Sequence, residues 1–164
     1  MKALLVLIIF PLLISFDSFC QQKNVITQEE LIGIWQVNSD EIASGWLDSY
    51  RFFGNKEFIF SPNQNDGLRR IISIKGTYRI ANNKLYLKVI STDELEGGHF
   101  ERSHITTLSD TWEIAGGVIK NLIQPTREEE VVEMKRCNNE TSKKTCILFD
   151  GRKYYKLEND PLNY

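Results

Sequence analysis

The chain has 164 residues, with 20 lysine and arginine residues against 22 aspartate and glutamate residues and a formal net charge of −2. This length suits one domain built around a single core. The near-neutral balance of mixed charges argues against nucleic acid and against anionic membrane surfaces as partners.

The N-terminus has the pattern of an export signal. Lys2 is followed by an almost wholly apolar run from Ala3 to Phe16. The run has about the length of a signal-peptide core and is shorter than the roughly 20 residues that a membrane-spanning helix needs. We therefore predict a signal peptide over residues 1–20 and a mature domain over residues 21–164 without a transmembrane span, in a periplasmic or secreted location.

Cys20 decides between two ways of processing this signal. Ordinary cleavage needs small residues at the last and third-last positions, which Cys20 and Ser18 supply if the mature chain begins at Gln21. A lipoprotein signal needs a small residue directly before the cysteine, where this chain has the bulky Phe19. Ordinary cleavage is favoured, and a lipid anchor at Cys20 is the alternative.

The other two cysteines are predicted to form a disulfide. Export places Cys137 and Cys146 in an oxidising compartment, where only one pairing is open to them. The segment Asn138 to Thr145 between them is polar and turn-like, so the bridge would close the base of a hairpin and stabilise the fold by about 2 to 3 kcal/mol. A zinc site is disfavoured because no second close-spaced cysteine pair is present, and no metal or other cofactor is expected.

A turn of helix leads into the first strand. Thr27 and Glu30 form a capping-box pattern, which predicts one helical turn over residues 28–31. The run that ends in Val37 then reads as a strand, in which Gly33 allows the backbone to bend and Trp35 presents a large apolar face.

The rest of the chain alternates short apolar strands with turn signals. Four pairs of segments flank two-residue turn sequences, and two more segments lie between them, for about ten strands with the first. The pairs are Tyr50–Phe53 and Glu57–Ser61 around Gly54-Asn55, Arg69–Ala81 and Lys84–Ser91 around Asn82-Asn83, Thr111–Ala115 and Val118–Gln124 around Gly116-Gly117, and Thr145–Phe149 and Arg152–Leu157 around Asp150-Gly151; the added strands are Phe100–Thr107 and Glu130–Arg136.

Consecutive strands joined by short turns favour antiparallel pairing between neighbours. Such a sheet either exposes two edges or closes on itself, and closure removes the edges. We therefore predict an all-β fold, an antiparallel up-and-down barrel of about eight to ten strands with a short N-terminal helical turn.

Gly33, Ile34 and Trp35 at the start of the first strand resemble the motif of the calycin superfamily. The hairpin Lys75–Leu87, with its Gly-Thr-Tyr, its turn and its Leu-x-Leu, is similar to one in lipocalin-like domains of bacterial secreted and envelope proteins. The resemblance implies a lipocalin-like barrel. In lipocalins an arginine near the last strand packs across this tryptophan, so the resemblance implies that role for Arg152, with Lys156 as the second candidate.

The leading functional expectation is an exported, non-enzymatic protein that binds a small hydrophobic or amphipathic ligand, such as a lipid, in the barrel. All three Trp, all six Tyr and six of the nine Phe follow residue 20, however, which is enough bulk to fill the interior. The alternative is therefore a filled barrel that serves as an interaction or structural module for an envelope protein partner. The candidate ligand-binding residues are Trp46, Phe52, Phe58, Phe60, Tyr86 and Trp112.

Two features leave room for other interpretations. Trp46 lies beside a glycine in a loop, where it could gate the barrel or simply pack on its rim. His99 and Glu101 share one face of a strand and could form half of a catalytic site, whereas His104 would face the other way. A solvated polar face is favoured for this pair, so an enzyme is the least expected class.

Overall fold

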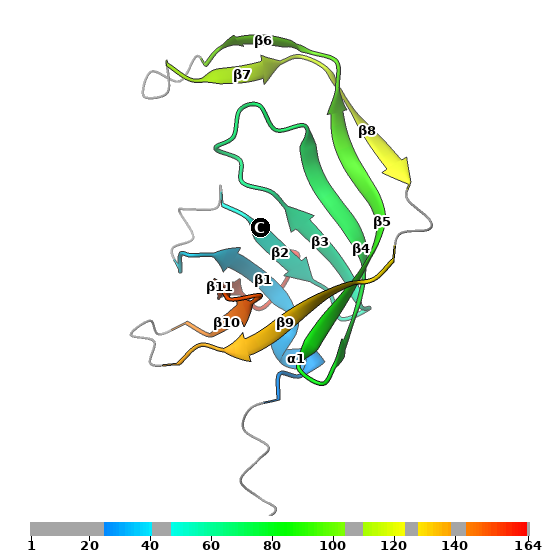
Figure 1. Ribbon diagram of the computed structural model, residues 1–164, viewed down its shortest axis with the longest axis vertical. Helices are drawn as coiled ribbons and strands as arrows, with labels where there is room; N and C mark the ends of the chain where they lie inside the picture. The colour runs from blue at the N-terminus through cyan, green and yellow to red at the C-terminus, as the bar shows by residue number, and fades with distance from the viewer. Residues whose placement is uncertain (1–24, 41–46, 104–109, 124–127, 139–143, 164) are drawn as a thin grey trace, which may run out of the picture.

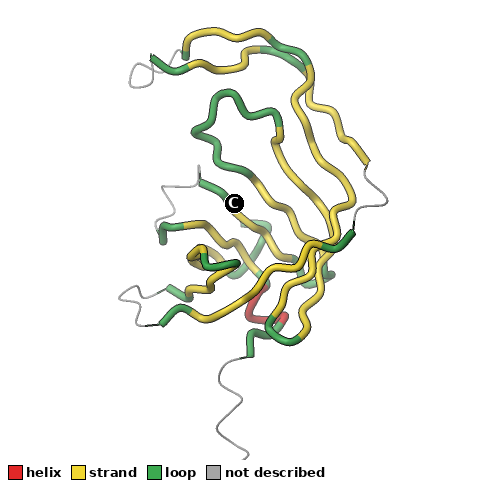
Figure 2. Tube along the Cα trace, in the orientation of Figure 1, coloured by secondary structure: helices red, strands yellow, loops and turns green. Residues whose placement is uncertain are grey.

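The computed structural model describes residues 25–40, 47–103, 110–123, 128–138 and 144–163, which form one short helix and eleven strands (Figures 1 and 2). The predicted signal peptide and Cys20 lie outside these residues. Within them, no helix is long and apolar enough to cross a membrane. The elements are α1 (Gln28–Leu31), β1 (Gly33–Val37), β2 (Ser49–Phe52), β3 (Glu57–Ser61), β4 (Ile71–Ala81), β5 (Lys84–Glu96), β6 (His99–Arg102), β7 (Trp112–Ala115), β8 (Val118–Ile123), β9 (Glu130–Arg136), β10 (Cys146–Phe149) and β11 (Arg152–Glu158).

The main sheet closes into a barrel, as predicted. Its strand order is β4-β3-β2-β1-β11-β10-β9-β5-β8, and an additional pairing of β4 with β5 completes a ring of eight strands. All pairings in it are antiparallel. The ninth strand, β8, lies outside the ring.

β8 and β9 share one edge of the long strand β5. β9 pairs with the first part of β5, from Lys84 to Leu87, and β8 pairs with the last part, from Ser91 to Glu96. Strand β5 therefore begins in the wall of the barrel and continues beyond it.

The last part of β5 forms an arm together with β6, β7 and β8. We define the arm as residues 91–102 and 112–123. β6 and β7 pair in a separate two-stranded sheet that continues the β5–β8 pair. Figure 1 shows this pair lying beyond the barrel, above the connection from β3 to β4. The Ile114 N–H donates to the Gly67 carbonyl oxygen in that connection at 2.9 Å.

The prediction of a hairpin turn at Gly116-Gly117 is wrong. This glycine pair joins β7 to β8 along one side of the arm, and Gly97 and Gly98 join β5 to β6 along the other side. All four glycines have positive φ, between 71° and 92°. The arm therefore bends where the two pairs lie opposite each other, and no chain reversal takes place there.

The other strong turn signals are confirmed. Asn82 and Asn83 both have positive φ, at 52° and 55°, and connect β4 to β5. Asp150 and Gly151, at 47° and 80°, connect β10 to β11. Two successive positive φ values are the signature of the tight hairpin turn that suits the twist of the strands.

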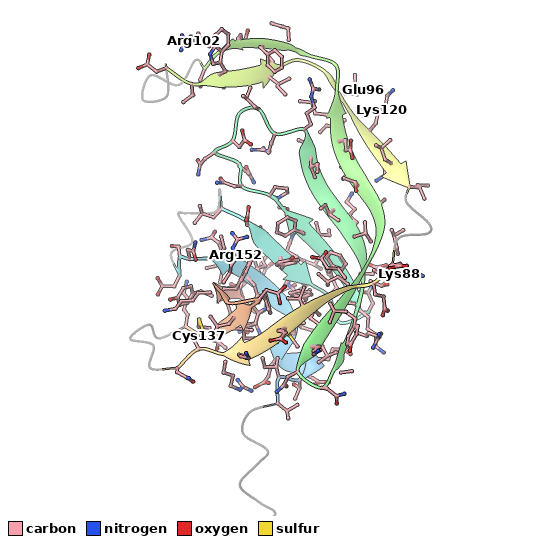
Figure 3. The ribbon with its side chains drawn as sticks, viewed as in Figure 1. Lys88, Glu96, Arg102, Lys120, Cys137 and Arg152 are labelled. Atoms are coloured by element: carbon pink, nitrogen blue, oxygen red, sulfur yellow. A yellow bond between two sulfur atoms is a disulfide. The ribbon has the colours of Figure 1, made fainter. Side chains whose placement is uncertain are left out.

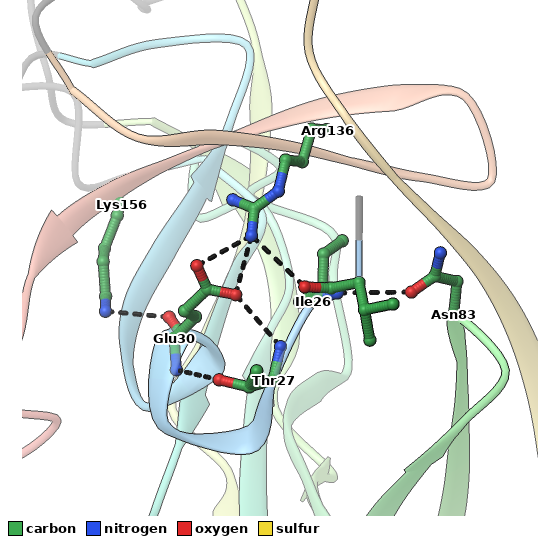
Figure 4. Close-up of polar contacts among 7 residues, drawn as sticks. Ile26, Thr27, Glu30, Asn83, Arg136 and Lys156 are labelled. Carbon is green, nitrogen blue, oxygen red and sulfur yellow. Dashed lines mark hydrogen bonds and ion pairs between the residues drawn. The ribbon is translucent and has the colours of Figure 1, made fainter. Parts of the chain in front are cut away.

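The helical turn α1 covers one end of the barrel. Its capping box is present, with the Thr27 hydroxyl accepting from the Glu30 N–H and the Glu30 carboxylate accepting from the Thr27 N–H. Ile26 and Leu31 are buried in the core. Arg136 donates to both carboxylate oxygens of Glu30 at 2.7 and 2.8 Å, which ties α1 to β9 (Figure 4).

The predicted disulfide is present between Cys137 and Cys146, whose Cα atoms are 5.5 Å apart. It lies at the ends of neighbouring strands β9 and β10. Figure 3 shows Cys137 at the margin of the barrel wall, away from the arm. The bridge therefore fixes one hairpin and leaves the far end of the barrel unconstrained.

Candidate functional site at the open end of the barrel

The half of the barrel next to α1 is filled with side chains. Trp35 and Phe52 are fully buried, and Phe58 and Tyr78 are 2% and 3% exposed. The indole N–H of Trp35 donates to the Leu31 carbonyl oxygen at 2.7 Å, which satisfies its only donor. The predicted ligand-binding residues Phe52 and Phe58 thus belong to the packed core.

A partly exposed aromatic layer lies above this core, toward the arm. Tyr50, Phe60 and Ile74 pack against the core without being fully buried. The Tyr50 ring centroid is 4.7 Å from that of Phe60 and 5.6 Å from that of Tyr154. We call the end of the barrel opposite α1, where these side chains are partly exposed, the open end, and we call Tyr50, Phe60 and Ile74 its floor.

Charged groups stand beside this floor. Arg152 donates to the Asp48 carboxylate at 2.9 Å, between the start of β11 and the residue before β2. Burial raises the pKa of Tyr50 above its ordinary value, with smaller contributions from Tyr154 and Glu130. Burial also raises the pKa of Tyr154 to about 12. Both phenols therefore stay protonated at physiological pH, next to one guanidinium group.

The base of the arm continues one wall of the open end. Ile74 on the core side of β4 pairs with Thr92, which in turn pairs with Leu122 on β8. Residues directly opposite in antiparallel strands share a face of the sheet. Thr92, Leu122 and the next such pair, Glu94 and Lys120, therefore lie on the same face as the floor.

Two of the predicted ligand-binding residues lie elsewhere. Tyr86 alternates with buried Leu85 and Leu87, so its side chain points away from the interior. On the outer face, the Arg79 guanidinium lies 3.7 Å from the centroid of the Tyr86 ring. Trp112 lies on the arm, 48% exposed and beneath Arg102. Trp46 falls outside the described residues. Among the predicted residues that the structure describes, only Phe60 contributes to the floor.

The basic residue over Trp35 is Lys156, and the first candidate, Arg152, is not there. The Lys156 ammonium is 5.5 Å from the Trp35 ring centroid and donates to the Glu30 carbonyl oxygen at 2.9 Å. Arg152 lies at the other end of β11, beside Asp48. Arg152 and Lys156 are an even number of residues apart on β11, so both side chains can face inward. Which of them lies against Trp35 depends on how far β1 and β11 are offset along each other in the barrel.

His99 and Glu101 do share a face of β6, with the imidazole 3.3 Å from the carboxylate. The His99 side chain is 72% exposed. Across the described residues, no group of three or more histidine, cysteine or acidic side chains is arranged to hold a metal ion.

The central floor residue, Tyr50, was not among the predicted ligand-binding residues. Its position two residues before Phe52 on the same strand was the signal that could have identified it, because alternate residues share a face.

Strand order, closure and the aromatic floor define the class of protein as a small, closed antiparallel β-barrel with a packed lower half and a partly exposed upper layer. Comparison with protein-family models, curated proteins and solved structures finds no match to the chain.

Proposed function

We propose that this protein binds a small amphipathic molecule at the open end of its barrel, as an exported member of the lipocalin-like class. The observation that carries the proposal is the partly exposed floor of Tyr50, Phe60 and Ile74 above a closed core. An apolar body would lie on these side chains. A polar group would meet the tyrosine hydroxyl groups or Arg152.

The filled lower half of the barrel limits the size of the ligand. Phe52, Phe58 and Tyr78 are buried in the layer between the floor and α1. A ligand would therefore lie across the floor, which favours a short or compact molecule over a long acyl chain that needs a deep channel.

The proposed role is binding without catalysis. The His99–Glu101 pair, the one acid–base arrangement that the sequence singled out, is on the arm, and its imidazole is largely in solvent. The export proposal is supported by the disulfide, because such bonds persist mainly in oxidising compartments.

The test is native mass spectrometry of protein purified without detergent, followed by organic extraction of any bound molecule. We expect a stoichiometric apolar companion. Tyr50→Ala should weaken its binding about tenfold, because one aromatic contact contributes roughly 1.5 kcal/mol.

Tyr86→Ala is the matched control, since it removes the same side chain from the outer face of β5 and should leave binding unchanged. Near-ultraviolet circular dichroism checks that both variants keep the native core. A protein that emerges without a companion and gains none from a panel of fatty acids and other amphiphiles would contradict the proposal.

A second function is favoured by a different observation. The arm exposes large apolar side chains, including Phe100 at 63% and Trp112 at 48%. Exposed apolar surface of this kind often marks a protein–protein contact. The barrel could therefore act as an interaction module through the arm, and the absence of any ligand in the first test would favour this role.

A further inference from the structure

Strand β8 is an exposed apolar edge. All six of its residues are exposed, and four of them are apolar: Val118 at 64%, Ile119 at 58%, Leu122 at 42% and Ile123 at 72%. It is the last strand in the order of the main sheet, and in the described part of the chain no strand pairs with its other edge. Such an edge is a template for another strand.

The charges around β8 are compensated within the chain. Lys120 forms an ion pair with Glu96 and stands opposite Glu94 in the register with β5, and Figure 3 shows Lys120 and Glu96 close together near the bend of the arm. On the other face, Asp93 accepts from Asn121 at 2.7 Å and pairs with Lys75 at 2.6 Å. The edge therefore suits a partner strand that is apolar and nearly neutral, as β8 itself is.

Symmetry restricts how two copies of β8 can pair. A two-fold axis normal to the sheet places the inner faces of the two copies on the same side of the joined sheet. Residues that lie opposite each other across the interface must then both have odd numbers or both have even numbers. The two registers with the most pairs are then centred on Lys120 and on Asn121. A register centred on Lys120 would place two lysines directly opposite each other, which is destabilising.

The register centred on Asn121 avoids this conflict. It places Ile119 opposite Ile123 of the second copy on the outer face, and Lys120 opposite Leu122 on the inner face, where the lysine stem can cover the leucine. We propose that the protein forms a two-fold dimer in which β8 pairs with β8 of a second copy, with Asn121 opposite Asn121. The two sheets then continue through the interface, and the apolar edge of each copy is covered.

Two variants, each with a single added cysteine, test the register. In the proposed dimer the two Asn121 positions are directly opposite, with Cα atoms about 4.5 to 5.5 Å apart, which is within the range that a disulfide spans. Asn121→Cys should therefore form a cross-linked dimer on mild oxidation. Lys120→Cys should not, because the two positions are diagonal neighbours about 7 to 8 Å apart. The unsubstituted protein controls for linkage through its own cysteines.

A second experiment tests association without a cross-link. Sedimentation equilibrium over a concentration series should give twice the mass of the chain for the unsubstituted protein. Ile123→Lys should shift it to the monomer mass, since it places a charge against Ile119 of the second copy. Val131→Lys, at an exposed position of β9, should leave the dimer intact.

A monomer mass for the unsubstituted protein throughout the series would overturn the proposal. Cross-linking through Lys120→Cys in place of Asn121→Cys would overturn the register, and open-ended polymers would overturn the two-fold pairing. These readouts do not depend on a bound ligand, so they stand apart from the test of the proposed function.

Discussion

Gly33 starts β1 with a φ of +129°, a backbone conformation that residues with a Cβ atom rarely adopt. A Cβ atom there would lie 2.3 Å from the Glu158 carbonyl oxygen on β11. Gly33→Ala should therefore lower the free energy of unfolding by about 2 kcal/mol or more. Urea denaturation measures the loss. Gly54→Ala, whose added atom meets only Ile32 at 3.7 Å, should stay within about 0.5 kcal/mol of the parent, and equal losses would contradict the argument.

Glu30 gives the fold a specific dependence on acid. Its hydrogen bonds from Arg136 and from the Thr27 N–H hold the pKa of this carboxyl below its usual value of 4.5. A lowered folded-state pKa contributes stability that is present above the unfolded pKa and is lost as pH falls through the folded pKa. Because the ion pair is partly exposed, its contribution should be about 1 kcal/mol at most.

Glu30→Gln should therefore be less stable than the parent at neutral pH and should lose less stability on acidification below pH 4.5. Denaturation curves over a pH series measure the difference. Glu29→Gln removes the same charge from the same helical turn and should follow the parent more closely. A Glu30→Gln variant whose pH profile is parallel to that of the parent would refute the role of this pair.

At the scale of elements, the bend of the arm depends on Gly98. This residue has a φ of +76°, and an added Cβ atom would lie 2.7 Å from the Ile114 side chain and 2.9 Å from the Ala115 carbonyl oxygen. Gly98→Ala should release the pairing of β6 with β7 and leave the barrel folded. Hydrogen exchange should show lower protection of the amides in these two strands only. Gly97→Ala, with nothing within 4 Å, should cause a smaller loss.

The disulfide acts on another element, the connection from β9 to β10. It joins residues only nine positions apart, so reduction should lower the free energy of unfolding by about 2 to 3 kcal/mol in the chain-entropy model. Urea denaturation with and without reductant measures this. A Cys137→Ser/Cys146→Ser variant should match the reduced protein and be insensitive to reductant.

At the scale of the whole molecule, local chemistry predicted most of the fold. The capping box of Thr27 and Glu30 and the turns at Asn82-Asn83 and Asp150-Gly151 depend on neighbouring residues alone, and all three are confirmed. The prediction of a hairpin turn at Gly116-Gly117 was wrong because a pair of glycines with positive φ suits a bend in a strand pair as well as a chain reversal. Only the long-range pairing of β5 with β8 distinguishes the two.

The site was harder to predict than the fold. Alternation groups residues by face but does not say which face is inward, so Tyr86 was placed inside when it stacks with Arg79 outside. A register shift in the β4–β5 pairing between Lys75 and Gly76 also breaks the alternation along β5. Trp112 could not be placed because nothing local shows that its strand leaves the barrel.

The outer arm, which we define as residues 97–103 and 110–117, shares little packing with the barrel. None of these residues belongs to the core cluster. The Ile114 N–H donates to the Gly67 carbonyl oxygen, and Arg70 donates to the Gly97 carbonyl oxygen at 3.1 Å, both in or beside the connection from β3 to β4. We therefore expect the outer arm to open without unfolding the barrel.

Excision of residues 97–117 tests this independence. Glu96 and Val118 stand opposite each other in the β5–β8 register, so an Asn-Gly turn can join them as a hairpin. The barrel should then unfold with its free energy unchanged within about 1 kcal/mol in urea, followed by far-ultraviolet circular dichroism. Because β8 is retained, the dimer should persist. A loss of several kcal/mol would show instead that the outer arm folds as one cooperative unit with the barrel.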